Sequence, residues 1–415
     1  MSGSIRPSPF AALLVPAFAV ALCACSSTTD SLGYNGNDLW PINPDRTTTN
    51  VFASWLGKTP AEIDAKITMT WNQLFYGDNT QKIYYIIDGT DQAEIRDTFH
   101  GDIRTEGFGY AMMIAVQLDK RTEFDRMWAY VKSVLSYPMT DPSGGYYQSI
   151  CDSLAPSPPV SCNDPFGHQQ FATALLLARD RWGVAGKHNY AVDAAALLDV
   201  MRHKEDMNGG IVNDVTNTFD LDTSLPFDVP EAQAAGVSRP SVMMPAFYEL
   251  WFEATKDPFW TRAAAAARDY WKRTAHTTTG LFPRRADFDG TPVENWDMFE
   301  SESFRAQINM VLDREWFKRD PWQIEESDRL LKFFSSKGMT YVGSYALDGA
   351  ALSPVREYAL VATNGVSAMI STHADRRAYV EDVWNMSIQT GPARYFSGLL
   401  HLTALLILSG QYRVL

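Results

Sequence analysis

Residues 104–110 read Arg-Thr-Glu-Gly-Phe-Gly-Tyr and open a segment, 105–119, whose later residues are mostly apolar. Thr105 is a suitable N-cap, which places Glu106 in the first turn of a helix that is otherwise buried. A carboxyl group there is costly unless it is paired or used, and burial raises its pKa as a general acid near neutral pH requires. The alternative is a first-turn glutamate that interacts with the helix dipole.

The same helical spacing recurs along the rest of the chain, and most segment ends carry Gly, Pro, Asp or Asn. One short run, 82–87, has the character of a strand instead. Twelve helices without a long linker predict a single all-helical domain, and because no repeat of about 34 to 47 residues is found, a closed barrel is favoured over a solenoid. We therefore expect an (α/α)6 barrel of six helical hairpins with a bowl at one end. The expected helices are 60–75, 105–119, 122–135, 168–182, 189–202, 244–255, 259–275, 301–317, 321–337, 360–372, 375–388 and 393–409.

Composition narrows the function. The 415 residues carry a formal charge of −13, which disfavours nucleic acid and anionic lipid as partners. Aromatic residues reach 13%, a value compatible with sugar-stacking surfaces. The 7 histidines are scattered, and no HExxH, GxSxG or P-loop spacing is found. Neither a metal enzyme nor a serine hydrolase is favoured, and we expect no cofactor and a monomeric protein.

The N-terminal segment is typical of an export signal. Residues 1–24 contain one arginine and a short apolar run that ends Leu-Cys-Ala before Cys25. This ending is similar to a bacterial lipobox, which predicts lipidation of Cys25; the alternative is an ordinary signal peptide cleaved nearby. Residues 25–50 have the composition of a tether, and residues 51–415 are expected to form a single catalytic domain. We expect an exported protein of a bacterial cell envelope, attached to membrane only through this lipid.

The four cysteines include no CxxC pair, which excludes a disulfide-dense scaffold and a zinc ribbon. Cys151 and Cys162 flank a proline-rich loop, and export permits a disulfide between them that would staple this loop.

A second acidic stretch, 296–305, reads Trp-Asp-Met-Phe-Glu-Ser-Glu-Ser-Phe-Arg. Ser301 could cap a helix here, and the alternative to a functional site is an ordinary acidic first turn. Hydrolysis of a glycosidic bond needs two carboxyl groups, about 5–5.5 Å apart for retention and about 6.5–9.5 Å apart for inversion. Two carboxylates from different helices could meet this need, although the sequence does not give their separation.

From about residue 50 to the C-terminus, ordered motifs resemble glycoside hydrolase family 8, especially its reducing-end xylose-releasing exo-oligoxylanases. The resemblance implies an (α/α)6 barrel, an inverting mechanism without metal or organic cofactor, and a role for Glu106, in an intact Thr-Glu-Gly motif, as general acid. The family's Ser-Asp-x-Tyr-Arg motif reads Ser-Glu-Ser-Phe-Arg at 301–305, which places Glu302 in the position of the general base with one extra methylene. The matching stretches are 71–78, 104–107, 112–119, 245–251, 279–281, 289–292, 315–317, 320–323, 362–364 and 408–410.

Three departures from the family pattern concern the substrate. The family's Pro-Asp-Gly motif reads Pro-Phe-Gly, so that Phe166 replaces a supporting aspartate for which Asp164 or His168 could substitute only in a rearranged loop. A tryptophan platform is replaced near Ser149. The family's Leu-His-Pro loop falls near residues 355–357, where Arg356 could pair a uronic acid or simply pair with its neighbour Glu357.

These residues predict an exported inverting glycosidase that hydrolyses oligosaccharides, with a role in carbohydrate metabolism and xylan degradation. The alternatives are the same fold with a shifted substrate, such as a uronic-acid-containing oligosaccharide, and a sugar-binding lipoprotein without catalysis. Further residues predicted to bind substrate are Tyr110, Phe166, His168, Trp296, Arg305, Arg356 and Tyr395.

Overall fold

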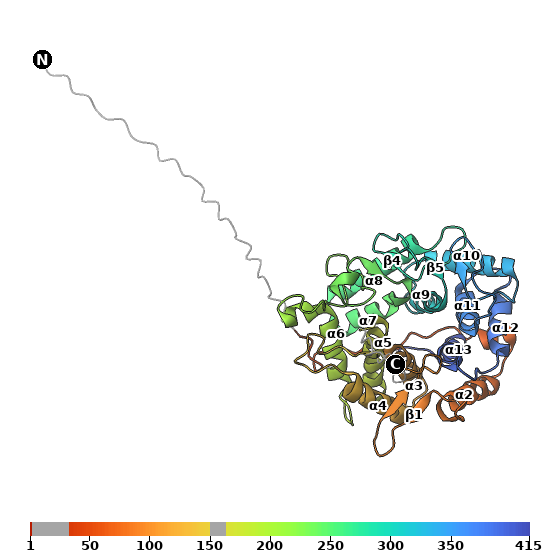
Figure 1. Ribbon diagram of the computed structural model, residues 1–415, viewed down its shortest axis with the longest axis horizontal. Coiled ribbons are helices and arrows are strands. Elements are labelled where there is room, and N and C mark those ends of the chain that lie inside the picture. The colour runs from red at the N-terminus through yellow and green to blue at the C-terminus, as the bar shows by residue number, and fades with distance from the viewer. Residues whose placement is uncertain (2–32, 150–162) are drawn as a thin grey trace. The chain divides into compact units, whose positions relative to one another are not determined.

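The computed structural model describes residues 33–149 and 163–415, together with Met1 (Figure 1). Within these residues all twelve predicted helices are present, and a short additional helix, α1, precedes them. The predicted strand is also present, as part of a hairpin. The helices are α1 (Val51–Leu56), α2 (Pro60–Tyr76), α3 (Thr105–Gln117), α4 (Arg121–Tyr130), α5 (Pro165–Trp182), α6 (Tyr190–Asn208), α7 (Pro245–Thr255), α8 (Pro258–Thr274), α9 (Arg305–Phe317), α10 (Trp322–Lys337), α11 (Tyr358–Ile370), α12 (Arg376–Asn385) and α13 (Arg394–Leu408).

Alternate helices form a closed inner ring. Helices α3, α5, α7, α9, α11 and α13 each contact the next, and α13 returns to contact α3. Their side chains are almost all buried, whereas the partners α2, α4, α6, α8, α10 and α12 bury one face and surround the ring (Figure 1). The predicted barrel of six inner and six outer helices is therefore confirmed.

Helices α3 and α5 approach each other closely because glycines line their contact. A Cβ added at Gly109 would lie 2.6 Å from the Cβ of Gln170, and one added at Gly167 would lie 2.5 Å from the Cβ of Thr105. Any larger residue at these positions would force the two helices apart. The close approach brings the N-terminal ends of α3 and α5 side by side.

Three two-stranded antiparallel pairs fix loops at the ends of the helices. Strands β1 (Tyr84–Ile86) and β2 (Ala93–Ile95) form the hairpin that precedes α3. Strand β3 (Val237–Ser238) pairs with β4 (Ala286–Asp287), and β5 (Met298–Phe299) pairs with β6 (Tyr345–Ala346). Because β3 and β5 are followed at once by polar residues of the candidate site, these short pairs hold that site in place.

The predicted tether is shorter than expected. From Gly33 the chain belongs to one compact unit that continues to Leu415. The Tyr34 hydroxyl donates to Asp257 over 2.5 Å, and the Thr48 hydroxyl donates to the Ile407 carbonyl over 2.6 Å. These contacts attach residues 33–50 to the helices, so the domain begins before the predicted boundary at residue 51.

Two predicted sites fall outside the described residues: the lipidation site Cys25 and the possible disulfide between Cys151 and Cys162. Among the helices that the structure describes, none combines the length and the apolar character needed to cross a membrane.

Candidate active site

Carboxylates gather at the N-terminal ends of the inner helices. Glu106 is the second residue of α3, Asp164 is the N-cap of α5, and Glu302 lies in a 3-10 turn, Ser301–Phe304, that leads into α9. The positive end of a helix dipole favours negative charge, so these ends suit carboxylates that must be buried.

The predicted caps of α3 and α9 were wrong. Thr105 is the first helical residue, and its amide donates over 3.1 Å to the hydroxyl of Ser149 from a different segment. Ser301 caps nothing; it opens the 3-10 turn with a φ of 37°, in the left-handed region. Such strain is uncommon outside glycine and often accompanies functional residues, here the adjacent Glu302.

Arg305 joins the two predicted catalytic carboxylates. Its Nη1 atom donates to Oε1 of Glu106, and its Nη2 atom lies 3.8 Å from Oε2 of Glu302. The arginine side chain is only 1% exposed, whereas Glu106 and Glu302 are 16% and 27% exposed. Both carboxylates can therefore reach a bound molecule while the guanidinium stays beneath them.

Two further arginines surround Glu302. Nη1 of Arg239 lies 3.3 Å, and Nη2 of Arg284 4.0 Å, from its carboxylate oxygens. Arg239 also binds Asp164 through Nη2 and Asp228 through Nε, both over 2.8 Å. The sequence analysis did not select Arg239, Arg284 or Asp228. Their only local signal is that Arg239 and Arg284 adjoin prolines in loops between predicted helices, which is too common to single them out.

The surroundings shift the pKa values of Glu106 and Glu302 in opposite directions. Burial raises the pKa of Glu106 to about 7, with help from the charges of Asp164 and Glu302 and against the opposing effect of Arg305. Burial also favours the neutral form of Glu302, but Arg239 and Arg305 outweigh it and lower the pKa of Glu302 below its usual value. At neutral pH the site thus pairs a carboxyl group able to hold a proton with an ionised carboxylate, the division of labour that acid–base catalysis needs.

Phe166 supports Arg305 from beneath. Its side chain is fully buried, with the Arg305 guanidinium carbon 4.1 Å from the ring centre. The ring of Tyr110, also buried, lies 5.2 Å from that of Phe166 between centres. Neither residue exposes a face to a sugar in this structure, so their predicted role in substrate binding is replaced by packing under the arginine.

His168 does not substitute for the missing aspartate. It is fully buried in α5, where its Nε2 atom lies 2.9 Å from the amide nitrogen and 3.0 Å from the carbonyl oxygen of Tyr147, and its ring stacks on Tyr146. Burial lowers the pKa of His168 to about 4, so the ring is neutral at pH 7. Its contacts hold Tyr146 and Tyr147 against α5.

Tyr395 and Trp296 lie beside this cluster. The buried ring of Tyr395 packs against Gly107, where any Cβ would collide with it, which explains why a glycine follows Glu106. The Trp296 ring is partly exposed and lies 4.5 Å from the guanidinium carbon of Arg284 and 3.8 Å from that of Arg285. Two guanidinium groups therefore already lie against the ring of Trp296, which was predicted to bind substrate.

Arg356 has a partner that the sequence analysis did not foresee. Its Nη2 atom donates to Asp382 of α12 over 2.6 Å, so the alternative that it pairs with its neighbour Glu357 was wrong. An arginine engaged in this way is not free to bind a uronic acid unless the pair opens.

A separate group of possible metal ligands lies between β2 and α3. Asp97, His100 and Asp102 place one ligand atom each within 4.8 Å of one another. Arg104, however, lies 2.8 Å from Asp102 and 3.5 Å from Asp97, and its charge opposes a cation there.

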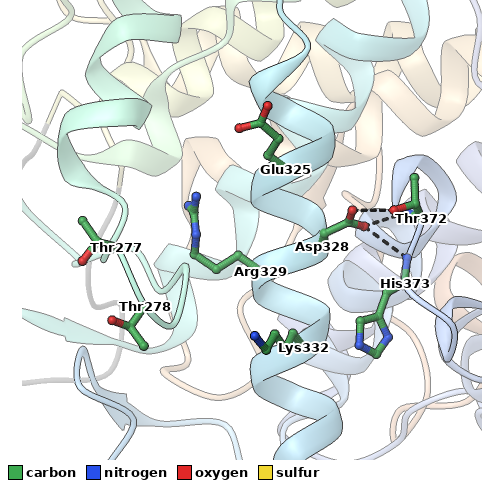
Figure 2. A pocket seen from close by; sticks show the side chains of 8 residues that line it. All are labelled: Thr277, Thr278, Glu325, Asp328, Arg329, Lys332, Thr372 and His373. Carbon is green, nitrogen blue, oxygen red and sulfur yellow. Dashed lines mark hydrogen bonds between the residues drawn. The ribbon is translucent and has the colours of Figure 1, made fainter.

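A surface cleft of about 590 Å³ lies between α10 and two loops (Figure 2). None of the residues that line it belongs to the carboxylate cluster, and none is Trp, Tyr or Phe, the side chains on which sugars stack. They are Thr277, Thr278, Glu325, Asp328, Arg329, Lys332, Thr372 and His373.

A closed ring of helical hairpins that carries at one end two carboxyl groups, one with a raised and one with a lowered pKa, is the arrangement expected of a glycoside hydrolase of the helical-barrel class. Residues 61–410 match the model of glycosyl hydrolases family 8. The chain belongs to this family and is an inverting glycoside hydrolase that resembles the reducing-end xylose-releasing exo-oligoxylanases.

Several exo-oligoxylanases match this chain over nearly their whole length. The chain is 34% identical to the reducing-end xylose-releasing exo-oligoxylanase Rex8A of Paenibacillus barcinonensis, over 85% of this chain and 93% of that enzyme. It is 35% identical to the reducing end xylose-releasing exo-oligoxylanase of Halalkalibacterium halodurans, over 88% and 94% of the two chains. A family 8 xylobiose complex from Teredinibacter turnerae superposes with a TM-score of 0.82 at 32% identity, covering 89% of this chain and 98% of that chain.

Proposed function

We propose that this enzyme hydrolyses xylo-oligosaccharides, with Glu106 as general acid and Glu302 as general base. The observation that carries the proposal is the pair itself: two partly exposed carboxylates share Arg305, and their pKa values are shifted apart. The substrate class is supported by the exo-oligoxylanases that the chain resembles.

In the proposed reaction, protonated Glu106 donates its proton to the glycosidic oxygen as the bond from that oxygen to the anomeric carbon breaks. Glu302 accepts a proton from a water molecule whose oxygen attacks the anomeric carbon from the opposite face. The anomeric configuration is therefore inverted. The turnover leaves Glu106 ionised and Glu302 protonated, and exchange with solvent restores both.

The tertiary structure bears on the two alternatives for the substrate and activity. A uronic-acid-bearing substrate requires a free cationic group, yet Arg356 binds Asp382 and Arg285 binds Asp228 over 2.7 Å. A sugar-binding protein without catalysis would not need two carboxylates with opposite ionisation. An uncharged xylo-oligosaccharide is therefore the favoured substrate.

The test is hydrolysis of xylotriose followed by NMR, which reads the configuration of the first product before it equilibrates. We expect an inverted product from the full chain and a large loss of rate, of about 10²–10⁴-fold, in Glu106→Gln and in Glu302→Gln. Reduced xylotriose, whose terminal unit is an alditol, distinguishes the two sites of attack. An enzyme that must recognise the reducing-end xylose would not cleave it, whereas an enzyme that attacks elsewhere would. A retained configuration, or rates indifferent to both substitutions, would contradict the assignment. Cleavage confined to a glucuronate-bearing oligomer would contradict the substrate class.

We also propose that the protein is exported and held to a bacterial envelope through a lipid on Cys25. The support is the apolar N-terminal run that ends in Leu-Cys-Ala-Cys. Detergent phase partitioning of the chain expressed with its own N-terminus tests this, and Cys25→Ser is expected to move the protein into the aqueous phase. A wild-type chain found in the aqueous phase, or in the cytoplasm, would contradict it.

A further inference from the structure

A third carboxylate lies beside Glu106. Asp164 precedes α5, and its Oδ1 atom accepts from the Phe166 amide over 2.9 Å and from Nη2 of Arg239 over 2.8 Å. The start of α3 packs against the start of α5 here, since a Cβ added at Gly167 would lie 2.5 Å from the Cβ of Thr105, and the charge of Asp164 raises the pKa of Glu106. The side chain of Asp164 is 11% exposed, less than that of either Glu106 or Glu302.

Only one of the two carboxyl oxygens of Glu106 is free to carry a proton. Its Oε1 atom accepts from Nη1 of Arg305, so a proton on the neutral acid belongs on Oε2. Asp164 is held ionised, because Arg239 and Arg305 outweigh the effect of burial and lower the pKa of Asp164 to about 2. An ionised carboxylate is a strong acceptor for a carboxyl O–H group.

We propose that Asp164 is a positioning residue for the general acid: fixed by Arg239 and the Phe166 amide, its carboxylate accepts the hydrogen bond of protonated Glu106 and keeps the acid loaded. The inference rests on the proposed function of Glu106. It explains how the site dispenses with an aspartate at position 166, where a buried phenylalanine supports Arg305 instead. The close packing of α3 on α5 at Gly109 and Gly167 makes the arrangement possible.

The charge of Asp164 is one of several that act on Glu106. Glu302 acts in the same direction as Asp164, because it also opposes ionisation of Glu106, whereas Arg239 and Arg305 favour ionisation. The titratable and charged groups that face Glu106 are Arg104 and Tyr110 around the start of α3, Asp164 at α5, Arg239 after β3, Glu302 and Arg305 at α9, and Tyr395 in α13.

The test is Asp164→Asn, which removes the charge but keeps the cap of α5, because asparagine caps helices as well as aspartate does. A charge about 4–6 Å away shifts a carboxyl pKa by about 1–3 units. We therefore expect the alkaline limb of the pH profile of kcat/KM to move down by at least about one unit, which is a loss of about 10-fold above the limb. Asp164→Ser, a second neutral cap, is expected to do the same and covers a failure of the asparagine variant to fold.

The matched control is Asp228→Asn. Asp228 binds the same arginine, Arg239, through Nε, but it is not among the strongest influences on the pKa of Glu106. This variant tests whether loss of any carboxylate partner of Arg239 is enough to move the alkaline limb. We expect the limb to stay in place in Asp228→Asn, whatever the effect on rate.

A second readout does not need turnover. Titration of glutamate δ-carbons by ¹³C NMR, with the Glu106 signal assigned from Glu106→Gln, is expected to show a downward shift of its midpoint in Asp164→Asn and none in Asp228→Asn. An unmoved midpoint and an unmoved limb in Asp164→Asn, even with reduced kcat, would overturn the proposal. Absence of turnover by the wild type on every xylo-oligosaccharide would instead refute the proposed function, and the NMR titration would still decide the role of Asp164.

Discussion

Phe166 gives a sharp test of how the active site is held together. Its ring is fully buried and lies 4.1 Å from the guanidinium carbon of Arg305, which in turn contacts Glu106 and Glu302. If this reasoning holds, Phe166→Leu should damage catalysis out of proportion to its effect on folding, because leucine fills much of the space but cannot interact with the cation.

The magnitudes follow from the contacts. Truncation of a buried phenylalanine to alanine costs about 3–5 kcal/mol, and a desolvated cation–π contact is worth about 2 kcal/mol of that. Phe166→Leu keeps most of the apolar volume, so we expect it to lower the free energy of unfolding by about 1–2 kcal/mol. Displacement of a catalytic group by about 1 Å can cost about 10²-fold in rate, so we expect kcat to fall by about 10- to 100-fold.

The assay combines urea unfolding with kcat and KM for xylotriose. A suitable control is Phe171→Leu, a fully buried phenylalanine in the same helix whose aromatic contacts are Trp128 and Tyr147. We expect this control to lose similar stability while keeping kcat. Equal loss of kcat in both variants, or wild-type kcat in Phe166→Leu, would refute the idea that the Phe166 ring orients Arg305.

Four further outcomes are expected. The value of kcat/KM should fall about 10-fold per pH unit above about 7, because Glu106 must be protonated and loses its proton as pH rises through its raised pKa of about 7. Glu302, whose pKa is lowered, stays ionised throughout this range. A flat profile to pH 9 would exclude Glu106 as the acid. Glu302→Asp should keep the inverted product, because a carboxylate is retained, and NMR would show otherwise if a different base acts. Gly107→Ala should lower kcat by about 10²-fold, because its Cβ collides with Tyr395 and displaces Glu106; a wild-type rate would argue against tight packing there. Burial raises the pKa of Glu326 to about 8 against the effect of Arg329, so the folded state keeps a proton that the unfolded chain releases. The free energy of unfolding of the wild type should therefore fall by about 1.4 kcal/mol per pH unit between the ordinary pKa of a glutamate and about 8. Urea unfolding of Glu326→Gln at several pH values should lack this slope.

Helix periodicity was sufficient to predict the twelve helices, because burial of one face leaves a local pattern in the chain, and the helix count agreed with the barrel that the family resemblance implied. Inner helices such as α11 are buried on every side, yet their length and bounding residues still identify them. The exact starts were less accessible: α5 begins at Pro165, earlier than the predicted 168, because Asp164 caps it. A cap depends on one side chain and leaves little trace in periodicity.

The sequence by itself singled out Glu106 and Glu302 as the candidate carboxylates, because Thr-Glu-Gly and Ser-Glu-Ser-Phe-Arg are continuous motifs in which the family resemblance can be read residue by residue. It could not determine their partners. Arg239 meets Asp164 and Glu302 across separations of 75 and 63 residues, and only closure of the inner ring decides such meetings. The same holds for Phe166, which meets Arg305 only because the ring brings the starts of α5 and α9 together. Electrostatic effects act through space rather than along the chain, so the ionisation of Glu106 and Glu302 was decided by the tertiary structure.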